Sequence, residues 1–370
     1  MRWQTRRTFI GSLFYTMITT LSLGVCAFFS GFSGRKRSSM EQQLYIVQGR
    51  GRENSKGAHG VSHSFEPSYL RLHKTGELKK RGKELWEILL DCKLCPRLCG
   101  DNKLLGKKGD CQANHQLEIS SFHPHFGEER PLVGEGGSGT IFLTNCSLRC
   151  VFCINWQISQ GGQGAPRSIE EMAAMMLYLQ KTGCHNINFV TPTHYSPHIL
   201  LAVDIAAANG LRLPLVYNTH GYERVEILKQ LDGIVDIYLP DFKYSDGKMA
   251  AKYSSGAEDY PEIAGQALLE MHRQVGVAKP AADGIMYRGL MIRHLVMPND
   301  ISGSGEVMSW IAENLPKDTY VNIMSQYRPA YKAFEYPDIS RRITRKEYQE
   351  VVSWAKTLGL TNLDIQGLSG

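Results

Sequence analysis

The sequence predicts an α/β fold, a partial (β/α)6 barrel related to the TIM barrel. Three observations predict it: six apolar runs resemble buried strands, helix-like segments separate them, and capping residues mark the starts of two of these segments. Strands that alternate with helices form a parallel sheet joined by right-handed crossovers. The expected strands are residues 140–144, 187–191, 213–218, 235–240, 290–297 and 320–324.

A helix-like segment follows each expected strand. Ser168 precedes Glu170 and Glu171, and Thr344 stands three residues before Glu347, which is the spacing of a capping box. A shorter helix is expected at residues 77–90, ahead of the barrel. The six helices expected within the barrel are residues 168–181, 196–209, 222–231, 259–275, 302–314 and 344–358.

Positive charge is concentrated near the N-terminus. The chain has 370 residues with 42 Lys+Arg and 36 Asp+Glu, but residues 1–108 hold 20 of the basic residues and 8 of the acidic ones. A basic arm is typical of nucleic-acid binding. Because no aromatic-interleaved basic run and no known nucleic-acid module accompanies it, we interpret this region as a solvated, membrane-proximal segment and expect no nucleic-acid partner.

Residues 8–34 carry no charge and are rich in apolar side chains. They follow a Thr-Arg-Arg-Thr-Phe-Ile sequence that resembles a twin-arginine export signal, and they exceed the roughly 20 residues that span a bilayer. A twin-arginine exported protein and a membrane-associated one are both consistent with this pattern; a buried helix in a cytoplasmic protein is the alternative. The expected domains are a signal or membrane anchor (1–37), a linker (38–76), a cysteine-rich module (77–130) and the core domain (131–370).

Seven of the nine cysteines lie in two clusters between residues 92 and 153, which favours reduced thiols and metal ligation over disulfides. Cys146, Cys150 and Cys153 form a C-x3-C-x2-C set directly after the first expected strand. Three thiolates at this spacing suit three irons of a [4Fe-4S] cluster, and the missing fourth cysteine leaves one iron open to a substrate or cofactor. A zinc site with a distant fourth ligand is the alternative.

This spacing, with Phe152 just before the last cysteine, resembles the loop of the radical SAM superfamily. The resemblance implies a [4Fe-4S] cluster that binds S-adenosylmethionine (SAM) at the open iron and cleaves it reductively to a 5′-deoxyadenosyl radical. It also implies a one-electron donor of the flavodoxin or ferredoxin type. Because the active sites of such barrels lie at the carboxyl ends of the strands, the three cysteines are expected there.

A second cysteine set precedes the barrel. Cys92, Cys95, Cys99 and Cys111 follow a C-x2-C-x3-C-x11-C pattern on a glycine-bearing loop. Four thiols complete a closed tetrahedral set, which suits zinc as well as a second iron–sulfur cluster. A reduced module without metal is the alternative.

Three segments narrow the resemblance. The opening at residues 92–100, the Asn-Trp-Gln sequence after Cys153 and residues 239–244 together resemble an uncharacterised branch related to pyruvate formate-lyase activating enzyme. The match implies that Asp241 and Lys243 hold SAM and place the radical; a salt bridge at the barrel mouth is the alternative. Activases carry Gly-Gly-Glu-Pro at the second strand end, and residues 186–194 of this chain depart from it, so that backbone carbonyls with Thr191 or Thr193 would replace it.

The other cofactor-binding candidates are Asn188, Thr193, Asn218 and His294. His294 resembles the family's histidine beside SAM, and a satisfied core histidine is the alternative. The branch implies an activase whose partner is a glycyl radical enzyme. Radical modification of a small molecule or protein side chain is a second interpretation, and a membrane-tethered iron–sulfur electron carrier without SAM turnover is a third.

Overall fold

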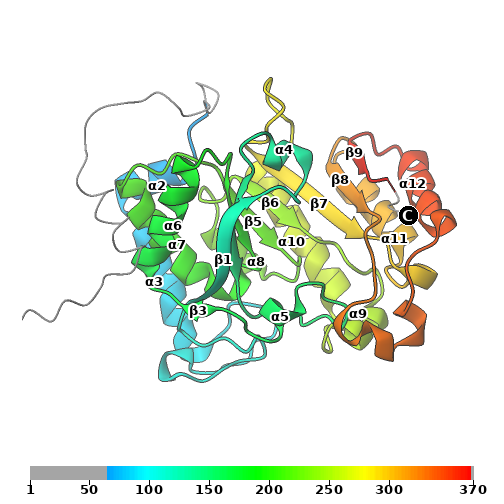
Figure 1. Cartoon of the computed structure of the whole chain (residues 1–370), viewed down its shortest axis with the longest axis horizontal. Helices are drawn as coiled ribbons and strands as arrows, with labels where there is room; N and C mark the ends of the chain where they lie inside the picture. Colours follow the sequence, from blue (N-terminus) through cyan, green and yellow to red (C-terminus); the bar gives the residue numbers. More distant parts are fainter. Residues whose placement is uncertain (1–64, 368–370) are drawn as a thin grey trace, which may run out of the picture. The chain divides into compact units, whose positions relative to one another are not determined.

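The computed structural model describes residues 65–367. The apolar segment expected at 1–37 and most of the expected linker lie outside these residues. Within the described part of the chain, no helix is both long and apolar enough to cross a membrane. Figure 1 shows a twisted sheet with helices packed along it.

The described residues form one nine-stranded sheet in the order β3-β1-β2-β4-β5-β6-β7-β8-β9. All six predicted strands are present, and each pairs in parallel with the next. The arrangement is consistent with the TIM-like partial barrel that the sequence predicts. These strands are β2 (Ser138–Leu143), β4 (Ile187–Val190), β5 (Leu215–Thr219), β6 (Ile237–Pro240), β7 (Gly289–Leu295) and β8 (Tyr320–Met324).

Helices connect the strands where the sequence predicts them. Both predicted capping boxes form, at Ser168 with Glu171 and at Thr344 with Glu347. Four shorter helices are additional: α2 (Tyr69–Thr75), α4 (Arg130–Val133), α5 (Trp156–Ser159) and α9 (Gly247–Tyr253). The expected helices are α3 (Glu77–Glu87), α6 (Ile169–Lys181), α7 (Ser196–Ala208), α8 (Val225–Gln230), α10 (Tyr260–Val275), α11 (Ser304–Asn314) and α12 (Arg345–Thr357).

The structure differs from the expected boundaries in two places. Helix α2 lies in the range expected for the linker, and it buries Tyr69, Leu70 and Leu72. Strand β1 (Glu118–His125) lies in the range expected for the cysteine-rich module, yet it pairs antiparallel with β2 in the main sheet. The sequence pattern missed β1 because most of its residues are only half-buried and it contains a proline. The other two unpredicted strands, β3 (Ala165–Pro166) and β9 (Leu363–Ile365), are very short.

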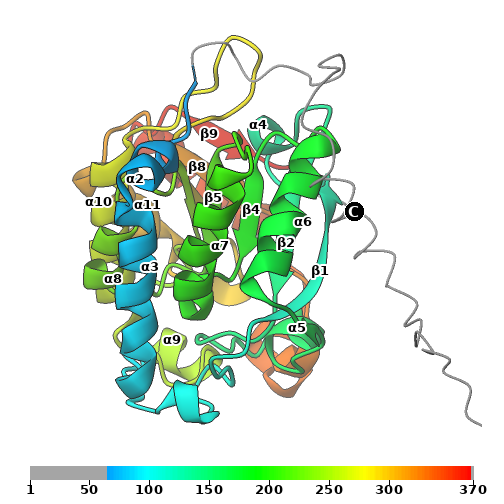
Figure 2. The same ribbon diagram turned by 90° about the vertical axis from the view of Figure 1, so that its left-hand side faces the viewer.

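Helix α3 packs closely against α7, and Figure 2 shows the two side by side. A methyl group at Gly82 of α3 would lie 2.9 Å from Cδ2 of Leu201. The glycine therefore permits the close approach that joins the N-terminal helices to the barrel.

Alternation along the strands separates an apolar floor from a polar layer. Residues two apart in a strand share a face, so that Ile237 and Leu239 lie below Asp241, and Met291 lies below Arg293. The polar side chains are thereby raised to the carboxyl ends of the strands. The floor is a buried cluster of Leu132, Val216, Ile237, Leu239, Ala278, Met286, Met291 and Tyr320.

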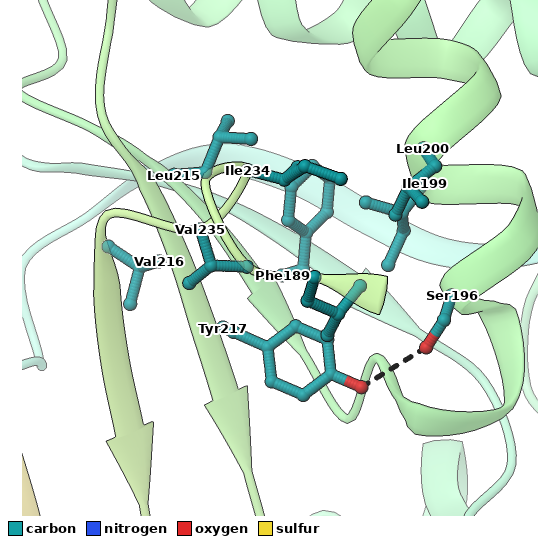
Figure 3. Close-up of a pocket in the computed structure, with 10 residues that line it drawn as sticks. Phe189, Ser196, Ile199, Leu200, Leu215, Val216, Tyr217, Ile234 and Val235 are labelled. Carbon is teal, nitrogen blue, oxygen red and sulfur yellow. Dashed lines mark hydrogen bonds between the residues drawn. The ribbon is translucent and has the colours of Figure 1, made fainter. Parts of the chain in front are cut away.

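A small void lies between the sheet and α7 (Figure 3). Its volume is about 10 Å³ and its lining is almost wholly apolar. The hydroxyls of Tyr217 and Ser196 bond each other at 3.1 Å, so no polar group is left for a ligand there. We interpret this void as a packing defect of the outer layer.

Candidate active site

The loop between β2 and α5 carries Cys146, Cys150 and Cys153. Its start is fixed where the Thr144 N–H donates to the carbonyl of Glu118 at 3.1 Å. Asn145 and Arg149, each just before a cysteine, have φ values of 69° and 51°. Left-handed backbone costs roughly 1–2 kcal/mol for a residue such as Arg149, whereas asparagine tolerates it better. The loop thus carries backbone strain at the positions that present two of its thiols.

All three of these cysteines line one cavity of about 440 Å³, here called the cysteine cavity. It lies at the carboxyl ends of the central strands, as the sequence predicts. Five other segments, the residues after β1 and the ends of β4, β5, β6 and β7, each contribute polar residues to its lining. These residues include Glu128, Thr191, Asn218, His220, Asp241, Lys243 and Arg293.

Burial has the largest effect on the pKa values of Cys146 and Cys150 in this loop. It raises the pKa of Cys146 to about 12 and that of Cys150 to about 11, while Lys243 favours the Cys150 thiolate and opposes the rise. The Ser254 hydroxyl donates to Sγ of Cys150 at 3.1 Å. The Cys153 Sγ lies 3.2 Å from the hydroxyl of Ser159. Hydrogen bonds to sulfur are one means by which a protein tunes an iron–sulfur cluster.

Asp241, Lys243 and Arg293 form a buried ion network in the wall of the cavity. The Lys243 Nζ lies 2.6 Å from Asp241 Oδ2, and Arg293 Nε lies 2.8 Å from Asp241 Oδ1. Burial disfavours the charged form of Asp241, but the charges of Arg293 and Lys243 outweigh it and hold the pKa of this carboxyl below its usual value. Asp241 is therefore ionised at neutral pH.

Asn218 and Glu128 extend this network across the cavity. The Asn218 Oδ1 accepts from Arg293 at 2.7 Å, and the Asn218 Nδ2 donates to Glu128 at 3.3 Å. Burial raises the pKa of Glu128 to about 7, although Arg293 opposes the shift. Strands β5, β6 and β7 and the segment after β1 are thus linked by polar side chains in one layer.

The structure brings together Asn218, Asp241 and Lys243, three of the predicted site residues. The other three candidates do not line the cavity. Asn188 is buried on β4 near Glu128. Thr193 is buried and donates to Glu223 at 2.5 Å. His294 is held by the carbonyl of Phe242 at 2.7 Å and the hydroxyl of Ser304 at 2.8 Å, as in the core alternative.

Thr191 reaches the cavity at the end of β4, where the activase motif is absent. Its φ is 61°, which is rare for a β-branched residue and marks local strain. His220 lines the cavity from the end of β5. Its Nδ1 accepts from the Tyr222 N–H at 3.1 Å, so the proton of the neutral ring lies on Nε2, 3.1 Å from Ser147 Oγ. Burial lowers the pKa of His220 to about 3 and keeps this ring neutral.

Sequence reasoning missed Arg293 and Glu128. Arg293 had a usable signal, because a charged residue within an apolar strand must find a buried partner. Glu128 had none, since it lies in a polar stretch after a strand that the pattern did not reveal. Only the folded chain places it beside Asn218 and Arg293.

The comparisons with known proteins agree with this geometry. Residues 140–261 match the model of the radical SAM superfamily. The chain is also 34% identical over 283 residues to "Uncharacterized protein MJ0674" of Methanocaldococcus jannaschii, a match that covers 74% of this chain and 76% of the relative. The chain belongs to the radical SAM superfamily.

Membership of the radical SAM superfamily implies a [4Fe-4S] cluster and SAM, and the cysteine loop suits them. Its three soft sulfur ligands share a cavity with acidic, basic and amide side chains. Within residues 65–367 no three Cys, His, Asp or Glu side chains surround a single metal-ion position. Thiols of a cluster bind different irons, so they do not converge on one ion as zinc ligands do.

The second cysteine loop of this radical SAM protein lies directly behind the first. The Cys146 N–H donates to the carbonyl of Cys111 at 3.3 Å. Arg97 donates to the carbonyls of Ser147 and Ser254, each at 3.0 Å. The second loop therefore braces the backbone on two sides of Cys150.

The thiols of the second loop surround a buried lysine. Lys103 is 1% exposed, and its Nζ lies 3.0 Å from Sγ of Cys111. Burial opposes its charge, but the neighbouring thiols raise its pKa. Gly109 is required beside them, because a methyl group there would lie 2.6 Å from Sγ of Cys99. Within residues 65–367 these four thiols do not converge on one metal-ion position.

Proposed function

We propose that this protein cleaves SAM reductively and releases a 5′-deoxyadenosyl radical. The observation that carries the proposal is that Cys146, Cys150 and Cys153 share one cavity with Asp241 and Lys243. When bound, the cluster supplies one electron that breaks the C5′–S bond of SAM, giving methionine and the radical. The protein positions SAM and shields the site from water.

Each polar residue of the cavity has a distinct part in this proposal. Lys243 offers a cation for the SAM carboxylate, and its charge also acts on Cys150. Asp241 offers a fixed anion, since two basic partners hold it ionised. Asn218 adds an amide at the same level. In place of Asn188 and Thr193, Thr191 presents the polar group at the end of β4.

The experiment is anaerobic reconstitution of the full chain with iron and sulfide, followed by SAM and dithionite. Formation of 5′-deoxyadenosine is expected. A protein that binds a cluster but forms no 5′-deoxyadenosine would instead be an iron–sulfur electron carrier, the alternative that is not a SAM-cleaving enzyme.

We propose, from the resemblance of residues 92–100 and 239–244, that the reaction is activation of a glycyl radical enzyme. The radical would take a hydrogen atom from a glycine of that partner, and a flavodoxin- or ferredoxin-type donor would supply the electron. Deuterium transfer from a glycine-deuterated partner into 5′-deoxyadenosine tests this. Deuterium transfer only from a small molecule or from another protein side chain would contradict the activase. It would support radical modification of that molecule or side chain instead.

We also propose that Cys92, Cys95, Cys99 and Cys111 bind a metal after Lys103 shifts from among them. Three buried thiols, a half-buried fourth at Cys99 and the mobility of a lysine stem support this. Cys111→Ser should then lose zinc or a second cluster by elemental analysis, while Cys184→Ser should not. Equal metal content in the two variants would contradict the site.

A further inference from the structure

The barrel is open on one side, and polar side chains rather than a strand ladder span the opening. Strands β1 and β3 form one edge of the sheet and β9 forms the other. Between these edges, Asn322 of β8 donates to Glu129 at 2.9 Å, and Arg293 of β7 lies 3.5 Å from Glu128. Glu128 and Glu129 follow β1, so two adjacent carboxylates reach across from that edge.

A second chamber of about 420 Å³ lies in this opening, here called the lateral chamber. It adjoins the cysteine cavity, because the two share Gly127, Glu128, Arg293, Met324 and Gln326 in their walls. A molecule with one group held in the lateral chamber can therefore extend into the cysteine cavity. The remaining walls come from the segment after β1, from β8, and from β9 with the residues after it: Glu129, Arg130, Asn322, Asp364, Ile365, Gln366 and Gly367.

Glu129 and Asn322 each leave one acceptor without a partner in this wall. Glu129 is 6% exposed and Asn322 is 2% exposed. Glu129 Oε1 accepts from Asn322, but Glu129 Oε2 and Asn322 Oδ1 are buried with no hydrogen-bond partner among the described residues. A buried acceptor left unpaired costs about 1–3 kcal/mol, and more for a carboxylate. The pair therefore calls for a hydrogen-bond donor.

The basic residues of the chamber do not supply that donor. Arg293 attracts Glu129 electrostatically, but it directs its hydrogen bonds to Asp241, Asn218 and Glu128. Arg130 is exposed at the rim. Asp364 adds a third carboxylate to the lining and accepts from Tyr320 at 2.8 Å. A positively charged donor thus suits the unsatisfied acceptors better than a neutral one.

We propose that the lateral chamber binds the ammonium or guanidinium group of the substrate, with Glu129, Asn322 and Asp364 as its recognition residues. This rests on the proposed function, since it places a cationic substrate next to the site of radical formation. The group belongs either to a free amine or to a lysine or arginine side chain of a peptide.

The test is calorimetric binding to the full reconstituted chain, with SAM present and no reductant. The probes are agmatine as a free amine, Nα-acetylargininamide as a peptide mimic, and Nα-acetylcitrullinamide as the neutral analogue of the latter. We expect at least one cation to bind, and the arginine derivative to exceed its citrulline analogue about tenfold if a peptide is recognised. Stronger binding of agmatine would identify a free amine. The proposal would be overturned if neither cation binds. It would also be overturned if agmatine does not bind and the citrulline analogue binds as tightly as the arginine derivative.

Glu129→Gln keeps the shape of the side chain and removes its charge. It should weaken binding of the preferred cation about tenfold, because a charge-assisted hydrogen bond is replaced by a neutral one. Asp364→Asn provides a second variant with the same expected direction if the first does not fold. Glu313→Gln on the exposed face of α11 is the matched control and should bind like the parent. Unchanged binding in both chamber variants would overturn the proposal.

This measurement is independent of the proposed function. Cation binding without 5′-deoxyadenosine formation in the reductant assay would support the cation site and contradict the proposed SAM cleavage. SAM cleavage without cation binding would support the proposed function and contradict the cation site.

Discussion

The two cysteine loops have similar thiols but different surroundings. Burial raises the pKa of Cys95 to about 12 and that of Cys146 to about 12, and left-handed residues adjoin cysteines in both loops. The first loop opens on a large cavity beside Asp241 and Lys243. The second closes on its own lysine, Lys103. Cysteine spacing therefore indicates capacity for metal binding, whereas the space in front of the thiols indicates which loop acts on a substrate.

The largest expected difference between the two cysteine loops concerns Cys150. Cys150→Ala removes a proposed cluster ligand that lines the cavity. We therefore expect loss of the first-loop cluster and of more than about 99.9% of SAM cleavage, because the electron pathway is absent. Electron paramagnetic resonance and product analysis measure the two effects. Cys184→Ala is the control, since Cys184 is buried between α6 and β4 away from the cavity. Retained SAM cleavage in Cys150→Ala would contradict the proposal that the first loop holds the cluster that cleaves SAM.

Buried charge gives a second contrast. The second loop buries the cation of Lys103, whereas the ends of β4 and β5 bury the carboxyl of Glu223 between Thr193 and Thr219. Burial raises the pKa of Glu223 from 4.5 to about 7. Because the folded state holds this proton more tightly, the contribution of Glu223 to the unfolding free energy falls as pH rises from 4.5 to 7, by about 3 kcal/mol in total.

Glu223→Gln should remove that dependence, because a neutral amide can still accept from both threonines. We expect the variant to gain stability over the parent by up to about 3 kcal/mol at pH 8 and to match it near pH 4.5. Urea unfolding at several pH values measures the difference. Glu313→Gln should follow the parent at every pH. An equal difference between Glu223→Gln and the parent at pH 4.5 and pH 8 would contradict the shift.

Much of the fold was predictable from the sequence, and the reason lies in the central strands. Strands such as Ile187–Val190 are buried on both faces, so apolar runs mark them plainly, while capping boxes mark the starts of two helices. Strand β1 escaped because it is a half-buried antiparallel strand with Pro124 and two histidines. The prediction of the polar layer was partial for a related reason. Asp241 and Lys243 adjoin a recognisable strand end, while Glu128 meets Arg293 through contacts between distant segments.

His294 and Thr193 show why residue type alone misplaces a site. Both lie near strand ends, where a cavity is expected, but strand alternation and local turns direct them away from it. His294 neighbours Arg293, and the two side chains point to opposite faces of β7. The outer-face position gives His294 two protein partners, whereas Arg293 reaches the cavity.

Arg97 sharpens the comparison because it links the two loops. Arg97→Ala leaves the carbonyls of Ser147 and Ser254 without this donor, which should lower the unfolding free energy by about 2 kcal/mol. We expect a faster loss of the first-loop cluster on dilution as well, followed by its absorbance. Arg97→Lys should recover part of the effect by donating to one carbonyl. Arg224→Ala is the control, since Arg224 contacts Lys93 rather than the first loop. Equal cluster lifetimes in Arg97→Ala and Arg224→Ala would show that the second loop does not brace the first.

The smallest expected effect concerns Ser254. Its hydroxyl lies 2.9 Å from the hydroxyl of Tyr244 and donates to Cys150 Sγ, so a short hydrogen-bonded chain ends on one thiol of the first loop. A donor withdraws electron density from a ligating sulfur, and its loss therefore lowers the reduction potential of a cluster held there. Ser254→Ala should slow SAM cleavage about tenfold or less, because one hydrogen bond contributes about 1 kcal/mol. A redox titration followed by electron paramagnetic resonance measures the potential. Ser302→Ala is the control, since the Ser302 hydroxyl donates to the carbonyl of Leu295 rather than to a cysteine. A potential that rises, or that shifts equally in the control, would show that this hydroxyl acts on packing rather than on the sulfur.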